Sequence, residues 1–395
     1  MLPLSGLSYT IIIMEKINNN GLKFFKTKNG TKLPLPVFFP DATRAVLKTL
    51  DSADIEDTKT PGILVNTYHL YNELGSRVIK KFGGIRKFMS WNGAVISDSG
   101  GFQIMTLVKA NKRFGAITDE AVVFRPTAKK KIIFTPEESI RFQMELNTDM
   151  VVVLDEFTDP KSDEKKACQS VERTILWAKR SKKYFEEICG KKGLDEKNRP
   201  YLLGIVQGGE FLNLRVECTQ RLVEIGFDGL GYGGWPITSQ GKFNYEVAQT
   251  IAKNTPEKYF LYGLGVGKPD EIVGCNDLGY SVFDCVLPTR DARHRRLYVY
   301  NADSIDDIDI RQAKFYSYFT PDKERYYSDS EPVSRACDCL LCARYSRAYL
   351  AHLFRIQDVS ALRLATIHNL RFYSLLMEKL FYCHSRESGN PSLIG

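Results

Sequence analysis

The sequence contains no long apolar segment. No stretch of about 18 consecutive apolar residues occurs among its 395 residues, which excludes a transmembrane helix of ordinary length. The opening residues include Ile11, Ile12 and Ile13, but they lack a basic region before the apolar run and a small-residue cleavage site after it. The pattern therefore does not predict a secretory signal, and Met14 is an alternative start of the chain.

Regularly spaced cysteine pairs are also missing. Of nine cysteines, three are clustered at Cys337, Cys339 and Cys342, and the others are scattered. This distribution is not that of a disulfide framework. It favours a reducing cytoplasm and a single metal site.

A strong excess of one charge is absent as well. The chain has 55 Lys and Arg against 47 Asp and Glu, a formal net charge of +8. A charge of this size permits a polyanionic partner without requiring one, so any basic surface must be local. The hydrophobic content of 43% and charged content of 26% are typical of a soluble globular protein. The length suffices for one large domain with an appendage, or for two ordinary domains.

Short apolar runs recur along the chain, and each ends in polar residues or glycine. The eight runs are 37–40, 63–67, 94–98, 150–155, 202–207, 229–234, 259–265 and 280–287. Near-continuous apolar strands are buried on both faces, which indicates a parallel sheet covered by helices. The expected fold is therefore an α/β (β/α)8 TIM barrel, with a doubly wound sheet as the alternative.

The segments between these runs predict helices and one insertion. A capping box at 135–138, with proline at the first helical position, opens a helix that extends to residue 146. Residues 163–187 and 213–225 have amphipathic patterns, and an acidic first turn begins at Pro269. The gap from 99 to 149 is too long for a bare connection, so we expect an inserted hairpin near 104–134.

In a barrel the polar residues that end the strands meet at one mouth. These are Asp98, Asp155, Gln207 and Asp284, together with the backbone at 233–234. Each alone has a plain explanation as a helix cap, a turn residue or a tight bend. Four such residues at equivalent positions favour an active site.

Asp284 is the most unusual of these residues, because an unpaired buried carboxylate is costly. It interrupts an apolar strand, which we expect over 280–290, and Arg290, Arg293, His294, Arg295 and Arg296 follow it. It either accepts a hydrogen bond from a neighbouring loop or acts as a nucleophile beneath a cationic rim for phosphates.

Cys337, Cys339, Cys342 and His368 form a candidate structural zinc site. Three thiolates and an imidazole fill a tetrahedral zinc shell and leave no position for water. A helix expected over 343–355 places His352 nearby as an alternative fourth ligand, and a second helix opening at 366 would present His368 in its first turn. Chance clustering of three reduced cysteines is the other alternative.

Several motifs together resemble the tRNA-guanine transglycosylase (queuine tRNA-ribosyltransferase) family. They are Asn-Thr-Tyr-His-Leu at 66–70, Asp-Ser-Gly-Gly-Phe-Gln at 98–103, the segments 263–269 and 283–290, and the Cys3His set. The resemblance runs from about residue 22 to about residue 380. It implies a barrel with a zinc subdomain, and a pentosyltransferase that exchanges the wobble guanine of tRNA for a 7-deazaguanine base on the route to queuosine. It also implies a homodimer, with Tyr345, Tyr349 and Leu353 in the interface.

The resemblance also implies roles for individual residues. Asp284 matches the nucleophile that takes the ribose C1′, and Asp98 matches the general acid and base. The base-binding positions are Asp98, Ser99, Gly100, Gly101, Phe102, Asp155, Gln207 and Gly234. The tRNA-contacting positions are Gly265, Val266, Gly267, Lys268, Pro269, Asp270, Glu271, Thr289, Arg290, Asp291, Ala292 and Arg293. Exchange with retained configuration requires two displacements through a glycosyl-enzyme, which agrees with these roles.

The chain departs from the family pattern at three places. Residues 235–239 read Trp-Pro-Ile-Thr-Ser, Phe157 stands where a small residue is usual, and the rim at 291–295 is altered. The first two flank the expected pocket for the 7-substituent, so the incoming base (aminomethyl, cyano or queuine) and the tRNAs used stay open.

The expected organisation is an N-terminal extension (1–21), a catalytic barrel (22–310), a zinc-binding helical subdomain (311–382) and a disordered tail (383–395). An inactive tRNA-binding or dimer-partner paralogue is the alternative function, although both Asp98 and Asp284 are present. The same chemistry on DNA is a third possibility.

Overall fold

A computed structural model describes residues 24–387 of the chain, except 111–112, 114, 128–129 and 239. The expected N-terminal extension and the alternative start at Met14 lie outside the described residues. The same holds for residues 388–395 of the expected tail. Residues 383–387 of that tail are helical, because the last helix continues to Glu387.

Eight parallel strands form a barrel, as the apolar runs predict. They are β3 (Val37–Pro40), β4 (Gly62–Val65), β5 (Ala94–Ser97), β9 (Met150–Val152), β10 (Tyr201–Val206), β11 (Gly229–Tyr232), β12 (Phe260–Gly263) and β13 (Val282–Cys285). The sheet order is β3-β13-β12-β11-β10-β9-β5-β4, and a parallel bridge between Asp41 and Leu64 joins its two ends. The expected (β/α)8 architecture is confirmed.

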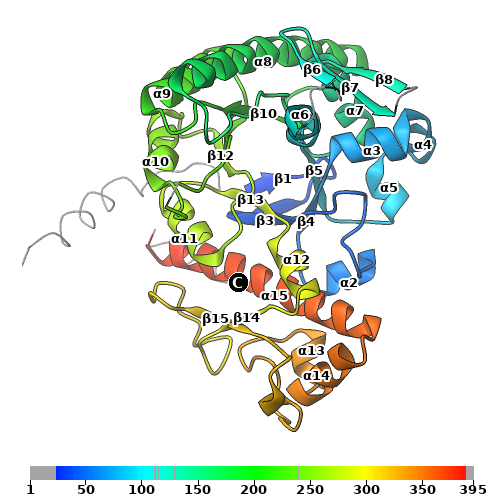
Figure 1. Cartoon of the computed structure of the whole chain (residues 1–395), viewed down its shortest axis with the longest axis vertical. Helices are drawn as coiled ribbons and strands as arrows, with labels where there is room; N and C mark the ends of the chain where they lie inside the picture. Colours follow the sequence, from blue (N-terminus) through cyan, green and yellow to red (C-terminus); the bar gives the residue numbers. More distant parts are fainter. Residues whose placement is uncertain (1–23, 111–112, 114, 128–129, 239, 388–395) are drawn as a thin grey trace, which may run out of the picture.

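Helices surround these strands (Figure 1). They are α2 (Ser52–Asp57), α3 (Thr67–Glu73), α4 (Gly75–Phe82), α5 (Ile85–Met89), α6 (Gly101–Ala110), α7 (Pro136–Leu146), α8 (Glu164–Lys192), α9 (Leu212–Ile225), α10 (Tyr245–Asn254), α11 (Pro269–Asp277) and α12 (Leu287–Arg293). The predicted cap of α7 is present, since the Thr135 side chain accepts a hydrogen bond from the Glu138 amide. The strand expected over 280–290 is shorter than predicted, because α12 begins two residues after β13 with proline in its first turn.

The insertion between β5 and β9 differs from the expected hairpin. Helix α6 covers its first part, because Ile104, Met105 and Val108 are buried at helical spacing. A three-stranded antiparallel sheet follows, formed by β6 (Gly115–Ile117), β7 (Val122–Thr127) and β8 (Lys130–Phe134).

One end of the barrel is covered by a hairpin that turns at residues 28–30. Its strands are β1 (Phe24–Lys26) and β2 (Lys32–Pro34), which pair antiparallel. The Phe25 ring packs against interior residues, with its centroid 5.6 Å from that of Phe39 and 6.0 Å from that of Phe260. These rings fill the end at which the strands begin, so the site lies at the opposite end.

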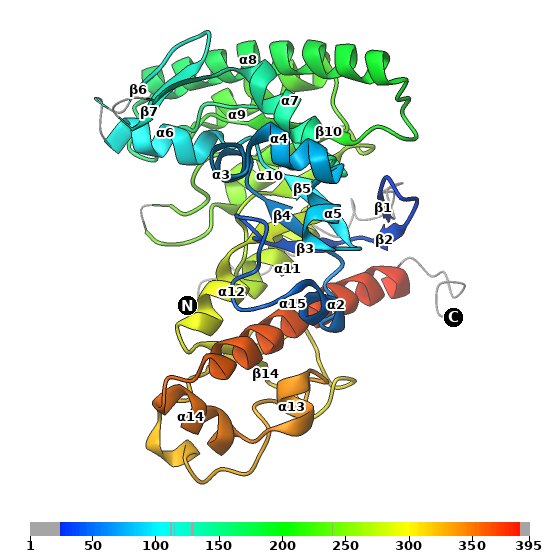
Figure 2. The same ribbon diagram turned by 90° about the vertical axis from the view of Figure 1, so that its right-hand side faces the viewer.

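The C-terminal part contains a two-stranded sheet, a short 3-10 helix and three α-helices. The elements are β14 (Leu297–Tyr300), β15 (Tyr316–Phe319), the 3-10 helix η1 (Glu324–Tyr326), α13 (Leu340–Arg344), α14 (Arg347–Arg355) and α15 (Val359–Glu387). In both ribbon views α15 runs between the barrel and these smaller elements (Figures 1 and 2). Because β14 pairs with β15, the boundary expected at 310–311 falls inside this small sheet.

Two helix predictions in this region are corrected. The single helix expected over 343–355 is broken at Tyr345, and Ser346 caps α14 by accepting a hydrogen bond from the Tyr349 amide. The second helix begins at Val359 instead of residue 366, because Asp358 accepts from the Ser360 amide just before it. Therefore His368 lies in the third turn. Among all described helices, none combines the length and apolar character needed to cross a membrane.

Candidate active site and metal centre

The predicted catalytic and base-binding residues lie at the C-terminal ends of the barrel strands. Asp284 is in β13, Asp98 follows β5, Asp155 follows β9, and Gln207 follows β10. Asp98 and Asp284 are close enough for their charges to interact, since the charge of Asp284 contributes to the raised pKa of Asp98. The barrel thus brings the two predicted catalytic carboxylates together.

Asp98 is held by three donors from neighbouring loops. Its carboxylate accepts hydrogen bonds from the Asn66 side chain (2.5 Å), the Thr67 amide (2.9 Å) and the Gly100 amide (3.1 Å). Burial raises the pKa of Asp98 to about 7, although these donors favour the charged form. A carboxyl group with such a pKa can give or take a proton near neutral pH.

Asp284 is buried, with 8% of its surface exposed. The Gly265 amide donates to its Oδ1 at 3.0 Å, and the Tyr262 hydroxyl is buried beside it. Burial raises the pKa of Asp284 to about 6, and the two neighbouring groups oppose that rise. The loop hydrogen bond anticipated as the plain explanation is therefore present, and it also fixes the orientation of the carboxylate.

Asp155 and Gln207 form a polar pair on the neighbouring strands. Gln207 Nε2 donates to Asp155 Oδ2 at 2.6 Å, and Gln207 Oε1 accepts from the Thr158 amide at 3.1 Å. Burial raises the pKa of Asp155 to about 6. Gly233 and Gly234 pass close to this pair, and a Cβ at Gly233 would lie only 2.6 Å from Gln207 Nε2. The carboxylate of Asp155 and the amide of Gln207 therefore lie beside the backbone of two glycines, which carries no side chains.

The segment 98–102 forms a tight turn into α6. Gly100 has a positive φ of 74°, and a Cβ there would lie 2.7 Å from the Tyr68 amide nitrogen. Ser99 is buried, and its hydroxyl accepts from the Gly101 amide at 3.2 Å. Phe102 is exposed and packs edge-on against Phe157, with ring centroids 4.9 Å apart. One departure from the family pattern thus contacts a predicted base-binding residue.

The predicted tRNA-contacting segments are buried over much of their length. The buried residues are Val266, Gly267, Pro269, Glu271, Thr289, Asp291 and Ala292, whereas Gly265, Lys268, Asp270 and Arg290 are exposed and Arg293 is intermediate. Some exposed groups already have partners: Lys268 pairs with Glu271 at 2.8 Å, and Asp270 accepts from the Tyr316 hydroxyl at 2.8 Å. The buried residues shape the rim, and the exposed ones are available for contacts.

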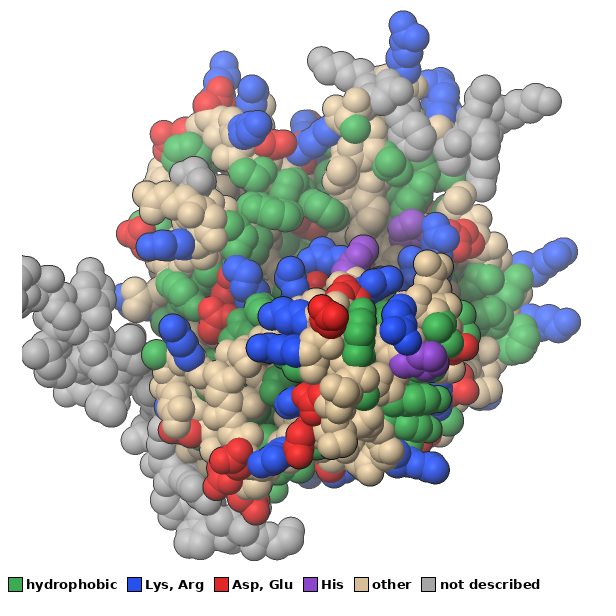
Figure 3. All heavy atoms as spheres, turned by 60° about the horizontal axis from the view of Figure 1, so that its bottom comes forward, with side chains coloured by type: hydrophobic (Ala, Val, Ile, Leu, Met, Phe, Trp, Pro, Cys, Tyr) green, Lys and Arg blue, Asp and Glu red, His purple; other side chains and the backbone are tan. Residues whose placement is uncertain are grey.

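Cations form the surface beside this rim. Arg290 is exposed, with its Nε 3.8 Å from Asp291 Oδ1, and Arg293 donates to the Thr289 carbonyl at 2.7 Å. His294 and Arg296 are also exposed. Figure 3 shows Lys and Arg side chains gathered in a band across one face, with some carboxylates among them. Part of the positive charge of the chain is therefore exposed beside the rim.

Cys337, Cys339, Cys342 and His368 form a group that could hold a metal ion. Their ligand atoms all lie within 4.8 Å of one another. His368 Nδ1 is 3.2 Å from the Cys342 sulfur and 3.5 Å from the Cys339 sulfur. These separations agree with the spacing of roughly 3.5 Å between ligands of a tetrahedral zinc ion. His368 Nε2 lies 2.7 Å from the Tyr298 carbonyl, which fixes the ring with Nδ1 toward the thiols.

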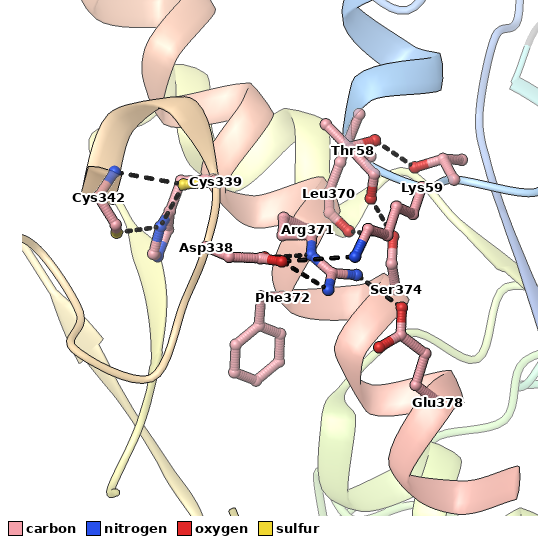
Figure 4. Close-up of polar contacts among 12 residues, drawn as sticks. Thr58, Lys59, Asp338, Cys339, Cys342, Leu370, Arg371, Phe372, Ser374 and Glu378 are labelled. Atoms are coloured by element: carbon pink, nitrogen blue, oxygen red, sulfur yellow. Dashed lines mark hydrogen bonds and ion pairs between the residues drawn. The ribbon is translucent and has the colours of Figure 1, made fainter. Parts of the chain in front are cut away.

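Asp338, between two of the cysteines, connects this group to α15 (Figure 4). Arg371 is buried and donates to Asp338 at 2.5 and 3.1 Å, and to Glu378 at 2.7 Å. Lys59, which follows α2, adds a contact of 3.5 Å to Asp338. The predicted alternative ligand His352 lies on the exposed side of α14 and is absent from the group.

Sequence reasoning missed four residues at the barrel mouth. The Asn66 side chain donates a hydrogen bond to Asp98, and the Tyr262 side chain lies beside Asp284. The guanidinium of Arg215 is buried and donates to three backbone carbonyls, those of Val206, Gly209 and Gly233. Asp41 directly follows β3, and its charge interacts with those of Asp98 and Asp284. The signal for Asp41 was available, because it ends an apolar run in the same way as the other strand-end carboxylates.

Comparison with known proteins identifies the family. The family model described as queuine tRNA-ribosyltransferase matches residues 22–380. A queuine tRNA-ribosyltransferase of Thermoanaerobacter sp. (strain X514) is 36% identical over 378 residues, covering 95% of this chain and 93% of the relative. That of Methylacidiphilum infernorum is 37% identical over 354 residues, covering 89% of each chain. The chain belongs to the queuine tRNA-ribosyltransferase family.

Proposed function

We propose that this protein is a tRNA-guanine transglycosylase, a pentosyltransferase that exchanges the wobble guanine of tRNA for a 7-deazaguanine base. The observation that carries the proposal is a pair of interacting carboxylates, the partly buried Asp98 and the buried Asp284, at the mouth of a barrel of this family. Two carboxylates with different surroundings suit a double displacement, in which one attacks carbon and the other moves protons.

In the first displacement, a carboxylate oxygen of Asp284 attacks C1′ of the target ribose from the face opposite the base. The C1′–N9 bond breaks, a glycosyl ester to Asp284 forms, and Asp98 gives its proton to the departing guanine. In the second displacement, Asp98 takes the proton from N9 of the incoming base as N9 attacks C1′. The ester bond to Asp284 breaks, so the configuration at C1′ is retained.

Asp155 and Gln207 are suited to read the edge of a guanine-like base. An ionised carboxylate accepts from the N1–H and amino donors of such an edge, and an amide donates to its carbonyl. The Gln207 amide nitrogen uses one hydrogen for Asp155, which leaves the second for the base. The target base must leave the anticodon stack to reach them, and a loop nucleotide is cheap to extrude.

The metal group is proposed to hold one structural Zn²⁺ per chain. Cys337, Cys339, Cys342 and His368 supply a closed Cys3His donor set, so the ion would stabilise the fold around it and take no part in base exchange. We retain the division into a catalytic barrel and a zinc-binding subdomain as part of this proposal, with β14 assigned to the subdomain.

A homodimer in the cytoplasm completes the proposal. Tyr345 and Tyr349 stack with ring centroids 5.2 Å apart, and Tyr349 is 44% exposed. Leu353 of the same stripe is buried within the chain, so it would support the interface from beneath. Analytical ultracentrifugation at micromolar concentration should give a dimer, and a monomer would contradict this part.

The main test is exchange of labelled guanine into unmodified tRNA, with trapping of the covalent adduct. The wild type should exchange guanine and form an adduct, whereas Asp284→Asn should bind tRNA but do neither, because a neutral amide cannot attack C1′. Full turnover by Asp284→Asn would remove the nucleophile assignment. A wild type that binds tRNA without any exchange would favour the alternative, an inactive tRNA-binding paralogue.

A further inference from the structure

Asp41 is a third carboxylate at the mouth of the barrel that the proposed mechanism leaves unused. It follows β3, whose neighbours in the closed sheet are β13 with Asp284 and β4 with Asn66 beyond its end. Strand residues two apart point to the same face. Because Phe39 belongs to the core inside the barrel, Asp41 points into the mouth as well.

The strand register places Asp41 beside the nucleophile. Asp284 pairs with Phe39, and Asp41 lies two residues further along β3 toward the opening. Burial raises the pKa of Asp41 well above its usual range, and the nearby charges of Asp284 and Asp98 add to that rise. The three carboxyl groups therefore lie close enough for their charges to interact.

Asp41 differs from the other two carboxyl groups in its hydrogen bonding. Asp98 accepts from three donors, and Asp284 accepts from the Gly265 amide. Asp41 Oδ1 is shielded from solvent and has no hydrogen-bond partner among the described residues. A buried polar atom without a hydrogen-bond partner is costly, so the unpaired Oδ1 of Asp41 favours a partner that the bound substrate supplies.

The stereochemistry of attack indicates which substrate group meets Asp41. A nucleophile that displaces the base of a nucleoside approaches C1′ from the opposite face of the sugar. The 2′- and 3′-oxygens of ribose lie on that face. Within an RNA chain the 3′-oxygen is a phosphodiester, so the 2′-hydroxyl is the one hydrogen-bond donor beside the attacking carboxylate.

We propose that Asp41 accepts a hydrogen bond from the 2′-hydroxyl of the ribose that Asp284 attacks, and so makes the site selective for RNA over DNA. This inference rests on the proposed function. A hydrogen bond beside the reacting carbon of a glycoside strengthens as positive charge develops there. It also distinguishes ribose from deoxyribose, because only RNA has this donor.

The test uses two anticodon stem-loops that differ at one atom, one all-ribose and one with 2′-deoxyguanosine at the exchanged position. Guanine-exchange kcat/KM is measured for wild type, Asp41→Leu, Asp41→Asn and Asp306→Asn. Asp41→Asn retains an oxygen acceptor at similar size, and Asp306→Asn makes the same chemical change at an exposed position between β14 and β15. The ratio of kcat/KM for the two stem-loops is compared between proteins, because their different intrinsic reactivity enters every ratio equally and cancels in that comparison.

The wild type should prefer the all-ribose stem-loop, and Asp41→Leu should reduce that preference about three- to tenfold, the effect of one hydrogen bond to an uncharged acceptor. Asp41→Asn should recover part of the preference, and Asp306→Asn should match the wild type. Equal losses on both stem-loops would assign Asp41 a structural role and overturn the inference. If Asp41→Leu does not fold, Asp41→Ala takes its place, and a preference in that variant equal to that of the wild type would overturn the inference too. A wild type inactive on every substrate would instead overturn the proposed function, and this inference with it.

Discussion

Asn66 should set the pH dependence of exchange, although it takes no part in bond making. Its side chain donates to Asp98 Oδ2 at 2.5 Å, and this hydrogen bond favours the ionised carboxylate. In the proposed first displacement Asp98 must be protonated and Asp284 ionised. With pKa values of about 7 for Asp98 and about 6 for Asp284, kcat/KM for tRNA should fall above about pH 7, where Asp98 loses its proton. It should also fall below about pH 6, where Asp284 gains one.

Removing the Asn66 donor raises the pKa of Asp98. A hydrogen bond to a charged group contributes about 1.5–3 kcal/mol, and one pKa unit corresponds to about 1.4 kcal/mol. Because the Thr67 and Gly100 amides still donate and water can replace the lost group, we expect a rise of about one unit. Protonated Asp98 then persists to higher pH, so the alkaline limb moves upward from about 7 to about 8.

Two substitutions separate this effect from damage to the fold. Asn66 also caps α3, since its Oδ1 accepts from the His69 amide at 3.0 Å. Asn66→Ala loses the cap and about 1 kcal/mol of stability, whereas Asn66→Ser keeps a capping oxygen but is too short to replace the donor to Asp98. Both should shift the alkaline limb, and only the alanine variant should lower the melting temperature.

The measurement is kcat/KM for tRNA from pH 5 to 9 in the three proteins, with thermal unfolding recorded alongside. The acid limb, which depends on Asp284, should stay near its wild-type position. An alkaline limb that is unchanged, or that moves downward, in Asn66→Ser would refute the assignment of Asp98 as the proton donor to the leaving base.

Three further predictions concern the metal group, the rim and the incoming base. Purified protein should contain one zinc per chain, and a metal assay that finds none would contradict the site. Cys339→Ser should lose the metal and clearly lower the unfolding temperature, whereas the rate of exchange by the protein that remains folded should change little. Arg290→Ala should weaken tRNA binding and lower the slope of log K against log salt concentration by about one, since its guanidinium is exposed and only loosely paired with Asp291. An unchanged slope would mean that Arg290 never contacts phosphate. Arg293→Ala tests the same for a side chain held by the Thr289 carbonyl. The kcat/KM for the aminomethyl base should exceed that for the cyano and queuine bases by less than about a hundredfold, because residues 235–238 supply no carboxylate for an ammonium group. The exposed Trp235 ring is the one group there that could attract an ammonium. A larger preference would show that this interpretation is wrong.

The barrel could be predicted because its strands have a strong local signal. Every strand of the closed sheet coincides with one of the apolar runs, and Thr135 and Pro136 marked the start of α7. Strands buried on both faces need uninterrupted apolar residues, so their pattern does not depend on distant contacts. The ends of three runs then located Asp98, Asp155 and Gln207, and the carboxylate that interrupts the last run located Asp284.

Features that depend on distant contacts could not be predicted in the same way. The break between α13 and α14 falls in a sequence with helical periodicity throughout, and Ser346 acts as a cap only because the chain turns there. Likewise, Arg215 resembles an ordinary helix-surface cation in the sequence. It is buried because three carbonyls from the strand ends converge on its guanidinium.

Helix α15 links the metal group to the catalytic rim through one short segment. His368 faces the thiols, and Asn369, the next residue, donates to the carbonyls of Pro288 and Arg296 at 3.0 Å each. One turn later the Tyr373 hydroxyl donates to the Gly267 carbonyl at 2.5 Å, in the loop whose Gly265 amide holds Asp284.

A metal ion held by this group would therefore have an indirect influence on the active site. The ion would fix His368, and the rigid helix would carry that constraint to α12 and to the loop after β12, which together form the rim beside the nucleophile. Such a link predicts that a weakened metal site disturbs tRNA binding at the rim and the loop whose Gly265 amide orients Asp284. Asp98 is held from residues 66, 67 and 100, outside this segment, and should keep its position.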